Sequence, residues 1–406
     1  MRLAEYVRII ANNIWFGLVS CFLHRDPHIV LFGSWMGTRF ADNSRFLFQY
    51  LSENKEALHL KRVIWVTRKP EINDMLRKMN YESYLCGTKE SKYWHLKSGV
   101  HILCNSTNHF GHDTDIDIQY SFGAKKIQLW HGAGMKAVGA SANRHVSNQF
   151  MKRLKSNYFI NKIMSEGGWG EAYFLTTSEL QLEICLASFR CSKKVMFVSN
   201  YPRNCECLEL LDEEKRVIDR IKQYKGTILY LPTFRDKGSR YTHPLNEKGI
   251  KLFLKKNNYL WIEKQHSFST IQQSDNNDAN VMHLNSAFDI NVLYPFVNAI
   301  VSDYSTVTFD GVYRHIPVIM YTPDLDDYNK GSNGLLSGFE TYYAPVMTKN
   351  PLIVLEMLED ALKNIYFDKK ERVDFYKKVF EDFWNNSKSP YETIWNDIKK
   401  KAHISI

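Results

Sequence analysis

Short apolar runs alternate with amphipathic helical segments through most of the chain. In the first half the runs Ile29–Phe32, Arg62–Thr67 and Val100–Cys104 have the composition of buried strands, and helical spacing follows at 42–54 and 70–79. Strands that alternate with helices are typical of parallel sheets joined by crossover helices. We therefore expect a doubly wound α/β domain, in which ligands bind beyond the carboxyl ends of the strands.

The same alternation restarts after a charged helical segment at 208–223. The apolar runs of the second half that predict strands are 227–231, 259–263, 281–284, 300–303 and 317–321. At 406 residues the chain exceeds the usual size of one domain. We expect two α/β domains, flanked by a short helical segment at each end, with the boundaries 1–25, 26–207, 208–385 and 386–406.

The first residues have an amphipathic pattern. Apolar side chains recur at helical spacing, and only 14–23 lacks strongly polar residues, which is about half the length of a membrane span. No small-residue cleavage site of the secretory type follows. We expect the helix to lie on a membrane surface. The alternative is a helix packed on the first domain.

Composition narrows the class of partner only slightly. Hydrophobic residues make up 44% and charged residues 24% of the chain, as in folded globular proteins. The net charge of +9 favours an anionic partner but fits nucleotide phosphates, phospholipid headgroups and nucleic acid equally well. The seven cysteines form no CxxC pair, which favours reduced thiols and a cytoplasmic location. Because the chain has no P-loop motif and no GxGxxG after a strand, P-loop ATPases and dehydrogenases are disfavoured.

Two adjacent hydroxyl residues, Ser305 and Thr306, stand between an apolar run that ends at Asp303 and a helical segment that extends to His315. The start of a helix offers unpaired N–H groups and the positive end of the helix dipole, and the hydroxyls add two donors. Phosphate groups bind to such an arrangement, so we expect an anion site. The alternative is that the two hydroxyls only cap a buried helix.

Cationic residues follow neighbouring strands of the same domain. Arg235, Lys264 and His266 each lie beyond the carboxyl end of a predicted strand. In a parallel sheet these ends converge near Ser305 and Thr306. Several donors around one helix start are typical of a diphosphate site.

A histidine of the first domain is also placed for chemistry. An apolar strand from Lys126 delivers His131 at its carboxyl end, and Gly132 and Gly134 follow. The glycines permit close approach of a substrate to the backbone, and such a histidine can act as a base near neutral pH. The alternative is a histidine whose ring only ties down the loop. Further along, Arg203 stands just beyond a short strand.

The acidic segment Asp324–Asp327 could hold a divalent metal ion, but a polar loop after the strand at 317–321 explains it equally well. We expect no metal site and no cofactor.

Several motifs occur together in one order: Gln128-Leu-Trp-His-Gly-Ala-Gly134, Pro202-Arg-Asn204, Leu231-Pro-Thr-Phe-Arg-Asp236, Ser302-Asp-Tyr-Ser-Thr306 with Asp310, and Tyr321-Thr-Pro-Asp-Leu-Asp326. In this order and spacing the chain resembles the CDP-glycerol glycerophosphotransferase family, which includes the primases and polymerases of teichoic acid and related capsule-synthesis enzymes. The resemblance covers roughly Pro27 to Lys349.

The resemblance implies a GT-B-type fold, in which two doubly wound Rossmann-like domains face an interdomain cleft that holds the active site. The donor would bind mainly to the second domain, and a membrane-associated acceptor would meet the first. By matching motif positions, the resemblance assigns His131 as the base and His266 as a second catalytic or phosphate-binding histidine. Binding of the donor diphosphate is assigned to Arg235, Lys264, Ser305 and Thr306. Binding of the nucleotide or the polyol is assigned to Asp303, Asp310 and Arg203.

The implied reaction moves glycerol phosphate, or a related polyol phosphate, from a CDP-activated donor to a hydroxyl of a lipid-linked or glycan acceptor and releases CMP. The implied location is the cytoplasmic face of a bacterial cell membrane, as a peripheral protein, with no nucleic-acid partner. Ser337 stands where polymerases of the family commonly carry an arginine, and Ala133 where a threonine is more usual. These departures leave open the polyol and the choice between primase and polymerase.

Two other functions remain compatible with the pattern. One is a GT-B glycosyltransferase that uses a nucleotide sugar, and the other is a non-catalytic protein that binds a membrane surface. Affinity for UDP-sugars, or vesicle binding without nucleotide affinity, would distinguish them.

Overall fold

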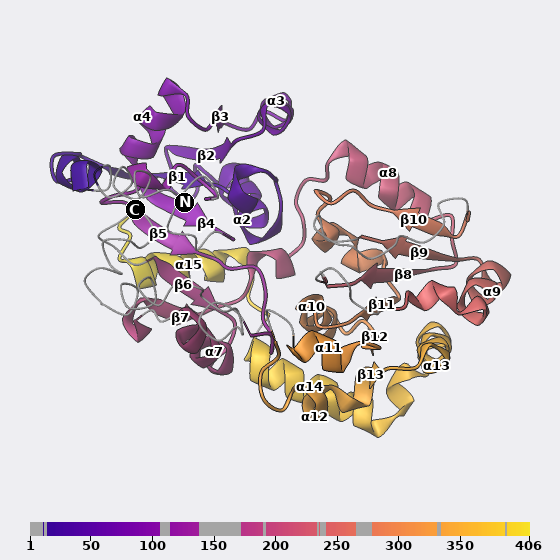
Figure 1. The fold of residues 1–406 in the computed structure, drawn as a ribbon. Coiled ribbons are helices and arrows are strands. Elements are labelled where there is room, and N and C mark those ends of the chain that lie inside the picture. The colour runs from indigo at the N-terminus through magenta and orange to yellow at the C-terminus, as the bar shows by residue number, and fades with distance from the viewer. Residues whose placement is uncertain are drawn as a thin grey trace.

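The computed structural model describes residues 11, 14–105, 114–137, 172–189, 192–233, 235, 241–264, 278–330, 334–385 and 388–406. Two parallel β-sheets, each with helices packed around it, form two lobes (Figure 1). We call the lobe around the sheet of β1 the first lobe, and the lobe around the sheet of β8 the second lobe. The predicted pair of doubly wound α/β units is confirmed.

The sheet of the first lobe has the strand order β3-β2-β1-β4-β5-β6-β7, and all of its neighbouring strands run parallel. The chain winds outward from the central β1 to β3, then returns past β1 to continue on the other side, which is the doubly wound pattern. Its strands are β1 (Asp26–Phe32), β2 (Arg62–Thr67), β3 (Ser83–Leu85), β4 (Ser98–Leu103), β5 (Lys125–Gln128), β6 (Tyr173–Thr176) and β7 (Met196–Val198).

The helices of the first lobe cover this sheet. They are α2 (Asp42–Glu53), α3 (Pro70–Lys78), α4 (Lys89–Lys97) and α7 (Glu179–Phe189), with a short 3-10 helix, η5 (Pro202–Asn204), at the end of the lobe. Sequence patterning predicted α2 and α3 but not α4 or β3. The sequence of α4 has no continuous apolar stripe, and β3 is too short to show a period of two.

The second lobe repeats the arrangement with the order β10-β9-β8-β11-β12-β13. Its strands are β8 (Gly226–Leu231), β9 (Tyr259–Glu263), β10 (Val281–His283), β11 (Ala299–Ser302), β12 (Val318–Tyr321) and β13 (Met347–Thr348). Its helices are α8 (Asp212–Ile221), α9 (Lys248–Asn257), α10 (Val307–Tyr313), α11 (Leu325–Lys330), α12 (Phe339–Tyr343) and α13 (Pro351–Leu362), and η7 (Ile290–Phe296) is a 3-10 helix.

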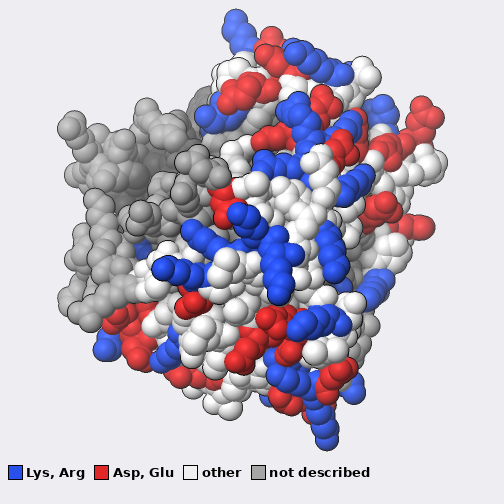
Figure 2. Space-filling model, turned by 90° about the vertical axis from the view of Figure 1, so that its right-hand side faces the viewer, with Lys and Arg blue, Asp and Glu red and all other residues white. Residues whose placement is uncertain are grey.

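The outer face of the second lobe is charged. Figure 2 shows Lys and Arg side chains near the middle of this face, with Asp and Glu side chains around them. Helix α9 exposes Lys248, Lys255 and Lys256. Because both signs are interspersed on this face, it does not single out one partner.

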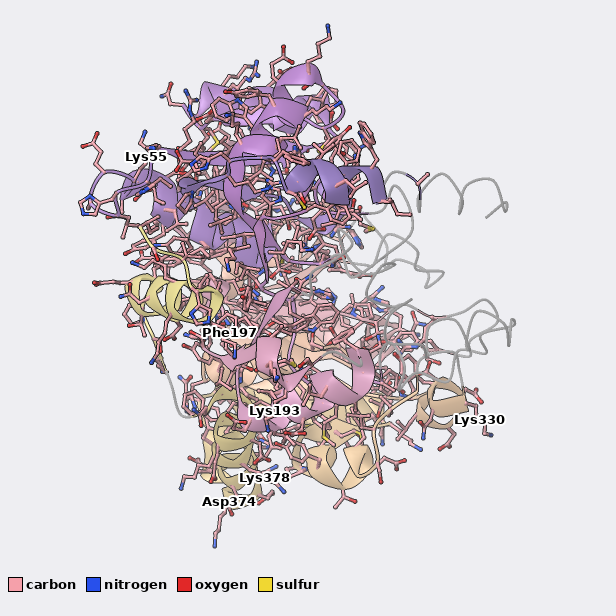
Figure 3. The ribbon with its side chains drawn as sticks, turned by 90° about the vertical axis from the view of Figure 1, so that its left-hand side faces the viewer. Lys55, Lys193, Phe197, Lys330, Asp374 and Lys378 are labelled. Atoms are coloured by element: carbon pink, nitrogen blue, oxygen red, sulfur yellow. The ribbon has the colours of Figure 1, made fainter. Side chains whose placement is uncertain are left out.

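The end of the chain returns to the first lobe. Helix α14 (Lys370–Trp384) contacts both α10 and α7, and α15 (Tyr391–Ala402) contacts β5. Figure 3 shows α15 beside the first lobe, near Phe197 of β7. The hydroxyl of Ser199 donates to Asp397 at 2.7 Å. The tail therefore ties the two lobes together, and the domain boundaries remain a prediction.

The N-terminal segment at 14–20 is helical and leaves part of its apolar surface in solvent. Trp15, Leu18 and Phe22 are exposed, Phe22 to 90%, whereas the ring of Phe16 packs on Tyr120. No helix in the described ranges is long and apolar enough to cross a membrane. Residues 1–10 lie outside the described part of the chain.

Candidate active site

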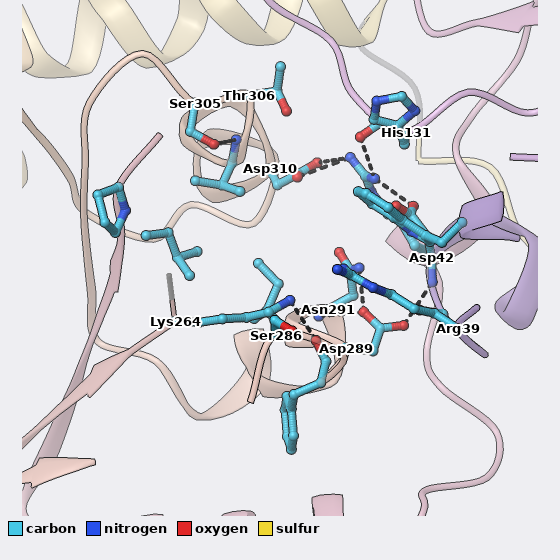
Figure 4. A pocket seen from close by; sticks show the side chains of 18 residues that line it. Arg39, Asp42, His131, Lys264, Ser286, Asp289, Asn291, Ser305, Thr306 and Asp310 are labelled. Carbon is cyan, nitrogen blue, oxygen red and sulfur yellow. Dashed lines mark hydrogen bonds and ion pairs between the residues drawn. The ribbon is translucent and has the colours of Figure 1, made fainter. Parts of the chain in front are cut away.

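A cavity of about 200 Å³ lies between the lobes (Figure 4). The first lobe lines it with Trp35, Arg39, Asp42, His131 and Arg203, and the second with Lys264, Ser286, Asp289, Asn291, Ser305, Thr306 and Asp310. Many of these residues follow β1, β5, β9 and β11 in the chain. The cavity therefore lies beyond the carboxyl ends of the parallel strands.

His131 stands three residues after the end of β5 and lines the cavity from the first lobe. Its Nδ1 lies 3.3 Å from the carbonyl oxygen of Cys104, and its ring lies against Trp35 and Trp130. An imidazole that donates from Nδ1 carries its lone pair on Nε2. Burial lowers the pKa of His131, against the opposing effect of Asp42. The imidazole is therefore neutral at pH 7, which is the form that can accept a proton.

The glycines after His131 contact the second lobe. A Cβ on Gly132 would lie 2.6 Å from Thr306 Oγ1, and a Cβ on Gly134 would lie 2.9 Å from the ring of Phe309. Gly134 also has a φ of +150°, which L side chains rarely adopt. We expected these glycines to admit a substrate to the backbone. The structure instead uses them to let the His131 loop meet the start of α10.

Arg203 joins three segments of the chain at the boundary between the lobes. Its Nη1 donates to Asp42 Oδ1 at 2.6 Å and to the carbonyl oxygen of His131 at 2.8 Å. Its Nη2 donates to both carboxylate oxygens of Asp310, at 2.9 and 3.0 Å. Nearby carboxylates hold the pKa of Arg203 well above its usual value despite its burial.

Arg203 and Asp310 were predicted to contact the nucleotide or the polyol. Both line the cavity, but the structure shows them paired with each other across the lobes. Burial raises the pKa of Asp310, and Arg203 opposes that shift. The visible role of the pair is to align His131 with α10, and contact with substrate remains a prediction.

Ser305 and Thr306 stand immediately before α10, as predicted, and both face the cavity. The Oγ of Ser305 lies 3.5 Å from the N–H of Val307, at the limit of a hydrogen bond. Thr306 is the N-cap residue, yet its side chain makes no capping bond. Capping alone therefore does not explain this pair of hydroxyls.

Lys264 follows β9 and enters the cavity from the second lobe. Its ammonium group donates to the carbonyl oxygen of Phe288 at 2.7 Å. Burial, together with the positive charge of Arg39, lowers the pKa of Lys264 to about 8. The other residue predicted after this strand, His266, lies outside the described residues.

Arg235 and Asp303 pair with each other away from the cavity lining, and their contact with the donor remains a prediction. We expected Arg235 to hold the diphosphate and Asp303 to contact the nucleotide or polyol, but neither lines the cavity. Arg235 is buried and pairs with Asp303 at 2.8 Å and with Asp324 at 2.6 Å. Asp303 also accepts the N–H of Thr233. A cation held by two buried carboxylates stabilises the loops around it, because unpaired burial of any of the three charges would be costly.

The same ion pair involves Asp324, the first residue of the segment Asp324–Asp327 that was considered as an alternative metal site. Asp324 accepts from Arg235 and from the hydroxyl of Tyr304. In the described ranges no group of three or more His, Cys, Asp or Glu residues is arranged to hold a metal ion.

Several polar or aromatic residues that line the cavity were not predicted from the sequence: Trp35, Arg39, Asp42, Ser286, Phe288, Asp289 and Asn291. Asp289 accepts the N–H of Asp42 at 2.8 Å and the N–H of Asn291 at 3.1 Å, so it links the lobes. Asp42 has a φ of +64°, an unfavourable conformation for a non-glycine residue. None of these residues belongs to a recognisable motif.

Comparison with known proteins identifies the family. The sequence model of the family described as CDP-Glycerol:Poly(glycerophosphate) glycerophosphotransferase matches residues 16–396. The chain belongs to this family. It is therefore a glycerophosphotransferase, and the resemblance seen in the motifs is confirmed. This membership sets aside the nucleotide-sugar transferase and the non-catalytic binding protein.

Curated relatives of this glycerophosphotransferase act in teichoic-acid synthesis. The teichoic acid poly(glycerol phosphate) polymerase of Bacillus spizizenii is 24% identical over 387 residues, which is 89% of this chain and 93% of the relative. The teichoic acid glycerol-phosphate transferase of Staphylococcus aureus is 24% identical over 391 residues, or 91% and 93% of the two chains.

Solved structures confirm the fold of the family member. The wall teichoic acid polymerase TagF superposes with a TM-score of 0.71 at 16% identity, over 98% of this chain and 95% of that one. A structure of TagF after a 15 minute soak with CDPG superposes with a TM-score of 0.70 at 17% identity, over 97% and 94%. The GT-B-type arrangement expected from the motifs is thereby confirmed.

Proposed function

We propose that this glycerophosphotransferase transfers glycerol phosphate, or a related polyol phosphate, from a CDP-activated donor to a hydroxyl of a lipid-linked or glycan acceptor, with His131 as the base. One observation carries the proposal: His131 of the first lobe and Ser305 and Thr306 of the second face the same cavity. The acceptor would meet the first lobe, and the donor diphosphate the second.

In the proposed step the acceptor oxygen attacks the donor phosphorus that is distal to cytidine. The O–H proton passes to Nε2 of His131 as the new P–O bond forms. The bond from that phosphorus to the bridging oxygen breaks, and its electron pair stays on the departing CMP. A neutral imidazole near the attacked phosphorus suits this step, because only the unprotonated ring can accept the proton of the acceptor hydroxyl.

Negative charge grows on the departing CMP, and donors fixed in a cavity stabilise such charge most effectively. Ser305, Thr306 and Lys264 are the described residues that supply them, and His266 remains predicted as a further donor. Arg235 and Asp303 contribute indirectly, because their ion pair fixes the loops of the second lobe. We assign no metal ion or cofactor to this step.

The identity of the polyol and the number of units added are tested with one assay. Purified protein is incubated with CDP-glycerol or CDP-ribitol and a defined lipid-linked acceptor, and the product is analysed by mass spectrometry. We expect the product to gain glycerol phosphate with release of one CMP per unit. Transfer from a UDP-sugar without transfer from either CDP-polyol would contradict the proposal.

We further propose that the enzyme acts as a peripheral protein at the cytoplasmic face of the membrane. The support is the exposed apolar group of Trp15, Leu18 and Phe22 on the N-terminal segment. Replacing all three by Ser is expected to lower sedimentation with anionic vesicles at least tenfold, with turnover of a water-soluble acceptor unchanged. Unaltered sedimentation would contradict this part of the proposal.

A further inference from the structure

Two cations from different lobes meet in the cavity on the side away from His131. Figure 4 shows Arg39 and Lys264 extending toward each other from opposite sides, and both line the cavity. Arg39 comes from the loop between β1 and α2, whereas Lys264 follows β9. The two charges are close enough for Arg39 to lower the pKa of Lys264.

Surrounding contacts hold both side chains in this opposed position. The guanidinium of Arg39 stacks over the ring of Trp35, 4.7 Å from its centroid, and the ammonium of Lys264 is anchored on the carbonyl oxygen of Phe288. Like charges held together in a partly desolvated cavity repel each other. An arrangement that keeps them there is stabilised when an anion binds between them.

The nearby carboxylates already have partners of their own. Asp42 accepts from Arg203, and Asp289 accepts the backbone N–H groups of Asp42 and Asn291. These carboxylates favour the charged form of Arg39, while burial lowers its pKa. Arg39 and Lys264 are thus two cationic side chains from opposite lobes that line the same side of the cavity.

We infer that Arg39, together with Lys264, binds the phosphate of the nucleotide that leaves the reaction. This inference rests on the proposed function. The attacked phosphorus must lie near His131, and the next residue of that loop, Gly132, meets Thr306 at the start of α10. The phosphate attached to cytidine is the other half of the diphosphate and extends toward the cation pair. When the bridging P–O bond breaks, its electron pair adds charge to that phosphate, and Arg39 and Lys264 neutralise it. Arg39 is thus a nucleotide-binding residue contributed by the acceptor-side lobe.

The arrangement also couples nucleotide binding to the relative position of the lobes. Arg39 and Lys264 contact the same phosphate only when the lobes lie as they do here. The departing nucleotide would therefore hold the lobes together until it leaves.

The test compares the affinities for CMP and for cytidine, which differ by the phosphate alone. Both are measured by isothermal titration calorimetry on the wild type, Arg39→Gln, Arg39→Lys and Arg216→Gln. Arg216 is exposed on α8 and serves as the control for the loss of one positive charge. We expect Arg39→Gln to weaken CMP binding about tenfold to a hundredfold and to leave cytidine binding within about twofold, because a charge-assisted hydrogen bond to phosphate is lost. Arg39→Lys should restore part of the affinity, and Arg216→Gln should match the wild type.

The outcomes separate this inference from the proposed function. CMP affinity that is unchanged in Arg39→Gln would overturn the inference alone. Equal losses for CMP and cytidine would also overturn it, because they would report a damaged lobe and not a lost phosphate contact. Arg39→Lys, with thermal unfolding followed in parallel, keeps the test decisive if Arg39→Gln folds poorly. A wild type that binds neither compound and does not turn over CDP-glycerol would overturn the proposed function as well.

Discussion

Lys264 illustrates how burial tunes a single side chain in this enzyme. A lysine in water has a pKa near 10.4, and here burial and Arg39 lower it to about 8. The ammonium is charged at pH 7 but loses its proton only slightly above that. Its attraction for the donor diphosphate should therefore depend on pH near pH 8, where a lysine with an ordinary pKa would stay protonated.

We predict that the KM for CDP-glycerol rises as the pH increases through about 8, since only the protonated form of Lys264 attracts phosphate. This rise in KM reports the pKa of Lys264 in the free enzyme, because a bound phosphate raises that pKa again. Lys264→Arg stays protonated and should show a flat KM from about pH 7 to 9.5. Initial rates over this range test both proteins. If the KM rises with pH in the same way in the wild type and in Lys264→Arg, Lys264 is not the titrating group.

The residues that line the cavity could be predicted from the sequence where they lie just beyond the end of a strand. His131, Lys264, Ser305 and Thr306 all follow strands, and the structure brings them to one cavity. Arg235 follows a strand as well, but no local pattern shows that Asp303 and Asp324 neutralise it. Asp303 and Asp324 lie 68 and 89 residues after Arg235 in the chain, so their contacts depend on tertiary packing. Arg39 and Asn291 were missed for the same reason.

At the scale of elements, the loop after β5 and the helix α10 form one unit although they belong to different lobes. Beyond Gly132 and Gly134, the loop continues into an antiparallel bridge in which Lys136 pairs with Leu335. The N–H of Leu336 donates to the carbonyl oxygen of Met135 at 2.9 Å. The loop that carries His131 is therefore positioned by the second lobe as well as by its own strand.

Gly132→Ala tests this unit. The added Cβ would lie 2.6 Å from Thr306 Oγ1 and 2.9 Å from Thr306 Cβ, so the loop and α10 must separate. A displacement of about 1 Å at a reacting centre costs about a hundredfold in rate, and we expect kcat to fall by about that factor. Gly249→Ala is the control, because its Cβ would meet only the flexible ends of two side chains, Leu355 at 3.1 Å and Glu247 at 3.6 Å. Equal turnover in both variants would contradict the contact.

Elements were more predictable than their contacts. Strand, turn and helix around Ser305 were visible in the sequence because the period changes from strand to helix there. The glycines after His131 were expected to admit a substrate, and the structure shows residues of the second lobe close to them. Their neighbours, Thr306 and Phe309, could not be deduced from the sequence, because a glycine indicates that something packs closely against the backbone but not which residue does so.

At the scale of the whole molecule, buried ion pairs join the lobes beside the cavity. Arg45 of α2 is fully buried and pairs with Glu214 of α8, with Nη2 to Oε2 at 2.8 Å. Glu214 also caps the start of its own helix by accepting the N–H of Leu211. The hydrogen bond and charge of Glu214 keep the pKa of Arg45 above its usual value although burial lowers it. The sequence predicted two domains but not these contacts, because each pair joins residues far apart in the chain.

We predict that Glu214→Ala destabilises the protein by about 3–5 kcal/mol, because Arg45 is left buried without its main partner. Asp219→Ala on the same helix should change stability by less than about 1 kcal/mol, since its pair with Lys222 is solvent-exposed. Urea unfolding measures both free energies. A Glu214→Ala variant as stable as Asp219→Ala would show that the pair does not hold the lobes together.

In the proposed reaction His131 of one lobe takes the acceptor proton while the other lobe holds the donor. The most direct test is CMP release from CDP-glycerol and acceptor by His131→Ala, with CMP affinity measured in parallel. We expect turnover to fall by about a hundredfold to ten-thousandfold while CMP affinity stays within about threefold of the wild type. Undiminished turnover in His131→Ala would contradict this role of His131.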